Sequence, residues 1–180
     1  MKEKSTVSYI LKLTLTLFLI TAVVAGLLGL VNYITADKIA EGNAQKTAAA
    51  KSEVLPADSY EEIAEFDSCD NIVRGLWRAG DAGYVAECVV GGSQGEIDLM
   101  VGIRADGTVS GVSIVKQTET AGLGANAVKP EFRDQFIGKS GDILVTKDGG
   151  EIEALTGATI TSRAVCKAVS AATACVAGLG

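Results

Sequence analysis

Histidine is absent from all 180 residues of the sequence, and several function classes are excluded with it. Without an imidazole the chain cannot be a Ser-His-Asp or Cys-His hydrolase, cannot ligate zinc or haem through histidine, and has no imidazole general base. Cysteine is scarce as well, and its four residues form neither a CxxC pair nor an iron–sulfur spacing: Cys69, Cys88, Cys166 and Cys175. We therefore predict no metal centre built by this chain.

Basic residues are also few, with 16 Lys and Arg against 22 Asp and Glu, for a net charge of −6. Three lysines against one glutamate give residues 1–34 a net charge of +2, which leaves −8 on residues 35–180. Proteins that bind nucleic acid neutralise phosphates with a basic surface. An acidic body without a basic stripe is therefore not expected to bind nucleic acid.

Charge is missing entirely from Leu13 to Val31, a run of 19 residues that are mostly Leu, Ile, Val, Ala and Thr. As a helix rising about 1.5 Å per residue, the run spans roughly 28 Å, close to the thickness of the hydrocarbon core of a bilayer. The alternative is a cleaved signal peptide, whose apolar region is about 7–15 residues long and precedes a small-x-small cleavage site. No clean site follows here, so we predict an uncleaved transmembrane helix over residues 13–34.

Lysines precede the apolar run, and the positive-inside rule then places residues 1–12 in the cytoplasm and the rest of the chain outside it. Residues 35–56 are rich in helix formers up to Pro56, and we expect them to form a solvated helical stalk. The domain proper is then expected over residues 57–180. We expect this domain in an extracytoplasmic compartment, held to the cell membrane by a single transmembrane pass.

Three strands joined by short turns are predicted in the first half of this domain: Tyr84–Val90, Glu96–Ile103 and Thr108–Gln117. The middle strand alternates, with Ile97, Leu99, Val101 and Ile103 on one face. Asp106-Gly107 is a two-residue hairpin signal between the second and third strands. An antiparallel meander follows from these patterns, whereas residues 57–82 give no secure assignment.

Helical patterns dominate the second half of the domain. Pro130 in a first turn predicts a short helix that ends before Gly138. Thr161 or Ser162 can cap a final helix that runs to about Ala177. Between these helices, the residues on either side of 147–150 are typical of a second hairpin. The predicted fold class is α+β, a mainly antiparallel sheet flanked by helices, with one N-terminal transmembrane helix.

The segment from Glu153 to Ser162 runs from the end of a predicted strand into the start of the final helix, and hydroxyl residues crowd around its Gly157-Ala158 step. Unpaired N–H groups and partial positive charge at a helix N-terminus stabilise an anion. Small residues let a bulky phosphate approach the backbone. The segment therefore suits a phosphate or phosphoester, and a simple capped turn is the alternative on spacing alone.

This segment resembles the flavinylation motif, Asp/Glu-x-x-Ser/Thr-Gly-Ala-Thr-x-Ser/Thr, of the FMN-binding domain family. In that family FMN is joined through its phosphate to the hydroxyl of the Thr after Gly-Ala, which is Thr159 here. Glu153 stands where the family usually has Asp; positioning the hydroxyl, recognition by a transferase and a plain surface carboxylate are its three alternative roles. The resemblance implies that the cofactor contacts Thr156, Gly157 and Ala158, and that Thr161 and Ser162 support the motif.

A second segment, about 35 residues earlier, is similar to the Glu-Thr-Pro-Gly-Leu-Gly loop that lines the flavin site in the same family. Ala121 replaces the usual proline, which makes the loop less rigid. By the same resemblance the residues expected at the cofactor are Glu119, Thr120, Gly122, Leu123 and Gly124. Leu123 either packs against the ring or serves as a small core anchor.

Within this family the chain is most similar to the G subunits of Rnf-type ion-translocating electron-transport complexes, which link reduced ferredoxin and NAD to ion movement. The resemblance implies an electron carrier with covalent FMN, other membrane and redox subunits as partners, and a separate flavin transferase that installs FMN from FAD. As one component of an oxidoreductase complex the chain has no complete active site of its own. The ion moved, sodium or proton, is not specified by the residues.

Three other functions stay open at this point. The C subunits of sodium-pumping NADH:quinone oxidoreductases share the motif and the anchor but are usually longer chains. A stand-alone extracytoplasmic flavoprotein would use the same domain. A membrane-tethered binding or assembly module would need no cofactor. Among the cysteines, a Cys69–Cys88 bridge is compatible with an oxidising compartment, whereas Cys166 and Cys175 fall on opposite sides of the final helix and cannot pair.

Overall fold

The computed structural model describes residues 2–66 and 70–179. The chain divides into two compact units, residues 1–45 and 46–180, and helix α1 (Lys2–Val54) belongs to both. In the first unit Ser8–Ala36 is long and apolar enough to cross a membrane, and none of it is buried by the protein. This segment contains the predicted span 13–34. The hydroxyls of Thr16, Thr21 and Thr35 donate to carbonyls four residues earlier, so they need no partner from lipid.

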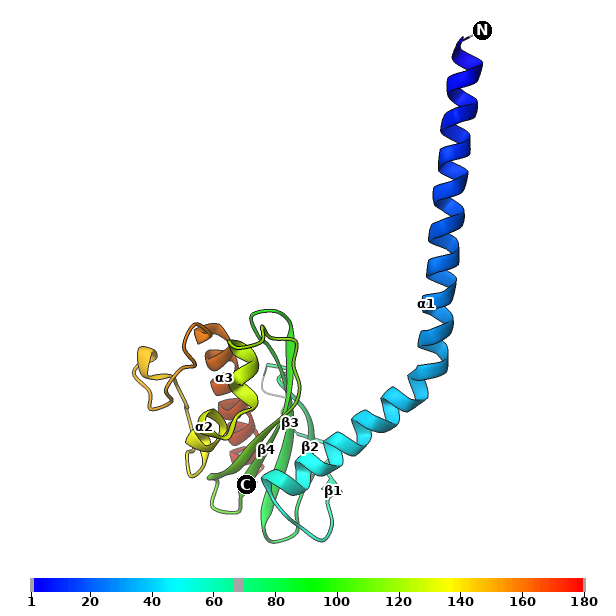
Figure 1. Ribbon diagram of the computed structural model, residues 1–180. Coiled ribbons are helices and arrows are strands. Elements are labelled where there is room, and N and C mark those ends of the chain that lie inside the picture. Colours follow the sequence, from blue (N-terminus) through cyan, green and yellow to red (C-terminus); the bar gives the residue numbers. More distant parts are fainter. Residues whose placement is uncertain (1, 67–69, 180) are drawn as a thin grey trace. The chain divides into compact units, whose positions relative to one another are not determined.

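The second unit is built on an antiparallel sheet with strand order β1-β2-β3-β4-β5, as far as the chain is described (Figure 1). The three predicted strands are confirmed as β3 (Gly83–Gly91), β4 (Glu96–Arg104) and β5 (Val109–Lys116). The turn at Asp106-Gly107 is confirmed too, with Gly107 at φ 83°. The unassigned stretch supplies β1 (Glu61–Glu62) and β2 (Val73–Arg78). The expected disulfide partner Cys69 lies outside the described residues.

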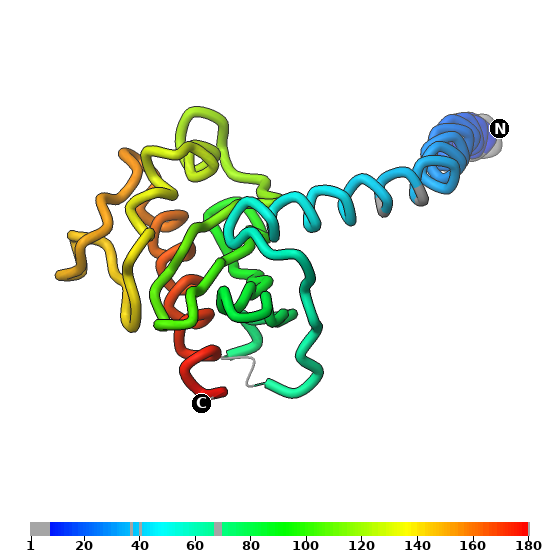
Figure 2. The backbone as a smooth tube through the Cα atoms, turned by 90° about the horizontal axis from the view of Figure 1, so that it is seen from below, coloured from blue at the N-terminus to red at the C-terminus, as the bar shows by residue number. Residues whose placement is uncertain are grey.

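One face of the sheet carries the main core, and helix α3 (Thr159–Ala177) lies along it (Figures 1 and 2). The predicted alternation of β4 is confirmed, since its four apolar side chains on this face are fully buried: Ile97, Leu99, Val101 and Ile103. The helix presents small residues, and Ala164, Ala168 and Ala172 let its backbone come close to the strands. Phe132 and Phe136 close the core with an edge-to-face ring contact.

The predicted short helix is confirmed by α2 (Pro130–Arg133), followed by the 3₁₀ turn η2 (Asp134–Phe136). A second 3₁₀ helix, η1 (Gly124–Val128), occupies part of the segment expected to be a loop. The predicted hairpin around residues 147–150 is wrong. Thr146 N donates to Ile152 O and Ile152 N donates to Leu144 O, which is the bonding of a parallel bridge. The turn between them is η3 (Thr146–Asp148), closed by left-handed Gly149.

The final helix begins at Thr159, two or three residues before the predicted caps, and Ala158 is its N-cap residue. Neither Thr161 nor Ser162 caps it. The Ser162 hydroxyl instead donates to Ala158 O and accepts from Leu155 N. Both side chains are fully buried and so belong to the packed first turns of the helix.

The other face of the sheet is covered by the last turns of α1. Ala50, Val54 and Leu55 are buried there with Val85 and Met100, so the expectation of a solvated stalk fails for these turns. The helix can approach the sheet this closely because Gly102 of β4 and Gly111 of β5 lie opposite each other and leave a gap in the sheet surface. An added Cβ at Gly102 would lie 2.5 Å from the carbonyl oxygen of Val54, so only glycine leaves room for the helix.

A polar bridge reinforces this contact. The Glu53 carboxylate accepts hydrogen bonds from the Ser113 hydroxyl, at 2.6 Å, and from Arg133 Nη1, at 2.9 Å. The bond from Ser113 and the neighbouring Arg133 hold the pKa of Glu53 below its usual value against the opposing effect of burial. The end of α1 is thereby linked both to β5 and to α2.

Replacing Gly102 with alanine is expected to destabilise the domain by about 1–3 kcal/mol, because the new methyl group overlaps the backbone of Val54. Chemical denaturation of the full chain in detergent, followed by the fluorescence of Trp77, measures the change. Gly91→Ala is the matched control, since a Cβ at this strand residue meets nothing within 4 Å. Equal unfolding midpoints for the two variants would contradict the described packing.

Candidate functional site

The two sequence motifs line one cavity of about 300 Å³. One wall comes from the Gly-rich loop before η1 and the other from the first turn of α3. The residues that line it are Ser93, Glu119, Thr120, Leu123, Gly124, Lys147, Gly157, Ala158, Thr159, Ile160 and Thr161. Segments about 40 residues apart in the chain therefore meet at the N-terminus of α3, where backbone N–H groups are free of helical partners.

The loop is tied to the helix by Glu119, which is only 8% exposed. Its Oε1 accepts from the backbone N–H groups of Ser93 and Gln94, at 2.8 and 3.0 Å. Its Oε2 accepts from the Thr161 hydroxyl at 2.5 Å. Burial raises the pKa of Glu119, but these three hydrogen bonds outweigh it and leave the pKa below its usual value. The carboxylate is therefore ionised and engaged, and it organises the cavity wall.

The same carboxylate explains two glycines, Gly124 of the loop motif and Gly92 of the turn after β3. A Cβ on Gly124 would lie 2.4 Å from Glu119 Oε2, and one on Gly92 would lie 2.4 Å from Glu119 Oε1. Side chains at either position would expel the carboxylate from its donors. Gly122 serves a different purpose, because its φ of 79° belongs to the left-handed region that favours glycine.

The hydroxyl groups at the start of α3 have different partners. Thr161 is bound to Glu119 and Ser162 to the backbone of its own turn, and both are fully buried. Thr159 is half-buried, and its Oγ1 accepts a hydrogen bond of 3.1 Å from Lys147 Nζ. Thr156 is exposed and lines a neighbouring cavity. Thr159, Thr161 and Ser162 are the helical hydroxyl residues of the motif. Because the other two are engaged within the protein, Thr159 is the one whose hydroxyl is accessible from the smaller cavity.

Lys147 is the functional candidate that sequence reasoning missed, because nothing in its turn sequence distinguishes it from an ordinary surface lysine. The next residue, Asp148, forms a two-bond ion pair with Arg163 of α3, at 2.6 and 2.7 Å. The Arg163 hydrogen bonds are the main cause that holds the pKa of Asp148 below its usual value. The turn and the first turns of α3 are thus fastened together.

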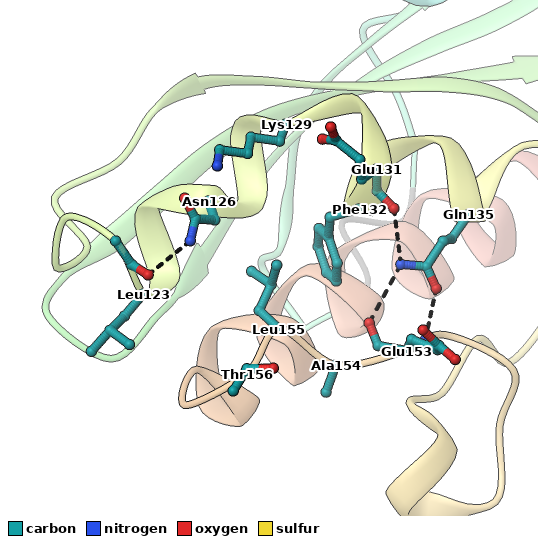
Figure 3. Close-up of a pocket in the computed structure, with 11 residues that line it drawn as sticks. Leu123, Asn126, Lys129, Glu131, Phe132, Gln135, Glu153, Ala154, Leu155 and Thr156 are labelled. Atoms are coloured by element: carbon teal, nitrogen blue, oxygen red, sulfur yellow. Dashed lines mark hydrogen bonds between the residues drawn. The ribbon is translucent and has the colours of Figure 1, made fainter.

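A second, larger cavity of about 570 Å³ adjoins the first, and Leu123 lines both (Figure 3). Figure 3 shows Phe132 and Leu155 facing this space, with Asn126 and Lys129 on the η1 side. The other lining residues are Gly122, Glu131, Gln135, Glu153, Ala154 and Thr156. The lining of this cavity mixes apolar and polar side chains in similar measure, and both cavity volumes fall in or at the edge of the ordinary range for a ligand pocket.

Glu153 lies on the wall of the larger cavity. Its backbone is held by Gln135, whose Oε1 accepts from Glu153 N at 2.7 Å and whose Nε2 donates to Glu153 O at 3.4 Å (Figure 3). Its carboxylate is exposed and forms no hydrogen bond to Thr159 within the described parts of the chain. In this structure Glu153 therefore does not position the threonine hydroxyl.

Replacing Glu119 with glutamine is expected to lower the stability of the domain by about 1–2 kcal/mol at neutral pH, because charged hydrogen bonds to three donors are lost. The folded-state pKa of Glu119 is lowered, so its contribution is complete above the unfolded value near 4.5 and is lost as the pH falls through the folded value.

Urea unfolding at pH 7 and pH 4 measures this difference. The gap between wild type and Glu119→Gln should be smaller at the lower pH. The exposed Glu96 offers a matched control as Glu96→Gln. If the gap were the same at both pH values, the carboxylate would not have the described partners.

Two family models match different parts of the chain. Residues 92–174 match the family model of the FMN-binding domain, and residues 1–54 match that of the RnfG N-terminal region. A crystal structure of the C subunit of the Na⁺-translocating NADH-quinone reductase from Parabacteroides distasonis covers 58% of each chain at 24% identity, with a TM-score of 0.45.

Two curated relatives match nearly the whole chain. The G subunit of the Na⁺-translocating ferredoxin:NAD⁺ oxidoreductase complex of Acetobacterium woodii is 38% identical over 94% of this chain and 93% of its own. The G subunit of the proton-translocating ferredoxin:NAD⁺ oxidoreductase complex of Clostridium ljungdahlii is 37% identical over 95% and 92%. The chain therefore belongs to the family of G subunits of ion-translocating oxidoreductase complexes and carries the FMN-binding domain of that family.

Proposed function

We propose that this protein is the electron carrier of a membrane-bound, Rnf-type ferredoxin:NAD oxidoreductase complex, and that FMN is attached by a phosphoester to Thr159. The observation that carries the proposal is the placement of the Thr159 hydroxyl. It faces the cavity that both flavin motifs line, and it contacts a lysine ammonium. The relatives named above are subunits of such complexes.

The smaller cavity suits the phosphate end of FMN. Thr159 is the first residue of α3, so a phosphate on its Oγ would lie beside the unpaired N–H groups of that helix. Lys147 Nζ adds a positive charge at the same oxygen. The donor set is thus that of an anion site, and the Glu119 oxygens are already engaged by Ser93, Gln94 and Thr161.

The larger cavity suits the ring system of FMN. Leu123 and Leu155 offer apolar surface, and Asn126 and Lys129 offer hydrogen-bonding groups at the edge. Leu123 is 43% exposed and lies where the two cavities meet. We therefore assign it to the ring, the first of the two roles expected for this side chain.

When bound, FMN supplies the redox chemistry, and the protein contributes attachment, orientation and electrostatic tuning. A covalent ester keeps the cofactor in place outside the cytoplasm, where no flavin pool refills the site. No carboxylate or other base contacts the Thr159 hydroxyl among the described residues, so a separate flavin transferase is needed to install the group. The partners are then this transferase and the other membrane and redox subunits of the complex.

Sodium and protons are both named among the relatives of this chain, so family membership alone does not choose the ion. The proposed topology places residues 1–12 in the cytoplasm and the domain of residues 57–180 outside it, because lysines precede the apolar segment. This chain is a relay in the complex. The ion pathway is assigned to its partner subunits.

Thr159→Ala is expected to abolish flavin attachment completely, because the acceptor oxygen is removed. Wild type and variant are each co-expressed with a flavin transferase and examined as fluorescent bands on a denaturing gel, with intact mass as the second readout. Thr118→Ala is the matched control, since this exposed threonine lies outside both motifs and lines neither cavity, and its band should remain. A dark wild-type band, or a bright Thr159→Ala band, would contradict the proposal.

The topology is tested with reporters fused after residue 180. Alkaline phosphatase folds only outside the cytoplasm and should be active there, whereas green fluorescent protein at the same position should be dark. Reversal of the positive flank, by Lys2→Glu with Lys4→Glu, is expected to reduce the phosphatase activity. The opposite pattern of reporter signals would place the domain in the cytoplasm.

A further inference from the structure

We propose that Lys147 is the positioning residue for the modification of Thr159, and that it remains paired with the phosphodiester after FMN is attached. The inference rests on the proposed function and adds a residue to it. Lys147 lies outside both sequence motifs, in the η3 turn, and its Nζ donates to Thr159 Oγ1 at 3.1 Å. It is the side chain that contacts the acceptor oxygen among the described residues.

Two neighbouring contacts form a clamp between η3 and α3. Lys147 and Asp148 are consecutive on the turn, whereas Thr159 and Arg163 are four residues apart and so share one face of the helix. Lys147 contacts Thr159, and Asp148 receives two hydrogen bonds from Arg163. The ion pair sets the position of the turn along the helix, and the lysine is thereby directed to the hydroxyl.

The turn that carries Lys147 is held by its own backbone. Asp148 N and Gly150 N both donate to Val145 O, and Thr146 N donates to Ile152 O. A Cβ on Gly150 would lie 2.0 Å from Leu144 O, so glycine is required for the chain to close on itself. Val145 and Ile152 are buried in the main core and anchor the two ends of the turn. The backbone of Lys147 is therefore fixed relative to the start of α3.

Charge explains why a lysine is suited to this position. Arg163 is engaged by Asp148 in an ion pair. Among the described residues, the cation left to a phosphodiester on Thr159 is therefore the Lys147 ammonium, which already contacts the acceptor oxygen. The same ammonium is a donor to Thr159 Oγ1, so it cannot take the proton from that hydroxyl; it orients the oxygen and stabilises negative charge that develops there.

The bonds of the transfer reaction follow from the acceptor. Thr159 Oγ forms a bond to the phosphorus that carries the flavin chain of FAD, and the bond from that phosphorus to the bridging pyrophosphate oxygen breaks. AMP leaves, and the hydroxyl proton is accepted by the transferase or by solvent. No electron is gained or lost. Lys147 contacts the attacking oxygen throughout, so its loss should slow this step more than the docking of the two proteins.

The test measures the rate of FMN incorporation into the purified full chain in detergent, with FAD and a purified flavin transferase, as a function of the concentration of the chain. Lys147→Met is expected to lower kcat about 10-fold or more, as the loss of one oriented charged donor does at other reaction centres, with KM for the chain within about twofold. Lys147→Arg should recover most of the rate. Lys167→Met is the matched control, because this exposed lysine of α3 lies about 12 Å along the helix from Thr159.

The variant Arg163→Met provides a second test of the same proposal. If Arg163 acts through Lys147, its loss should slow incorporation in the wild-type background but add little to Lys147→Met, which a double-mutant cycle measures. Thermal unfolding and intact mass of each unmodified variant separate misfolding from slow transfer. Lys147→Gln keeps a hydrogen-bond donor but removes the positive charge. Because the charge is what stabilises the attacking oxygen, this variant should be as slow as Lys147→Met.

Equal kcat for Lys147→Met and wild type would overturn the inference and leave the proposed function intact. A change confined to KM would overturn it as well, since the lysine would then serve docking to the transferase. No incorporation into wild type would overturn the proposed function itself and the inference with it.

Discussion

A buried carboxylate in the loop before η1 holds the functional site together. Glu119 receives two backbone N–H groups from the turn after β3 and one hydroxyl from the first turn of α3. These three segments are far apart in the chain, and the glycines among them leave the space that the carboxylate fills. Because an ionised group in this position needs all of its donors, the loop, the turn and the helix must assemble together.

The hydroxyl residues of the second motif illustrate how burial separates structural from functional groups. Thr161 and Ser162 are engaged within the protein, and both contribute to the start of a helix whose N-cap residue, Ala158, makes no side-chain capping hydrogen bond. Thr159 differs because it is partly exposed and its partner is an ammonium on a turn that the core anchors. A group that must react has to be accessible, and a group that positions it has to be anchored.

The last turns of α1 are part of the domain. Val54 enters the space left by Gly102 and Gly111, and Glu53 is bonded to Arg133 of α2. The residue before Arg133 is Phe132, which lines the larger cavity. One wall of the proposed flavin site is thus joined through α2 to the end of α1.

Local patterns in the sequence were enough for the apolar helix, the β3–β5 meander, the helix from Pro130 and the family motifs, because each depends on neighbouring residues and a short period. β1 and β2 carry no such pattern: β2 forms a strand because β3 offers it an edge, and β1 then pairs with β2. The start of α3, the parallel bridge at Val145 and the contact of Lys147 with Thr159 were decided by tertiary structure alone. Each requires residues that are distant in the chain to come within bonding range. The conformational preferences of a single segment carry no information about such contacts.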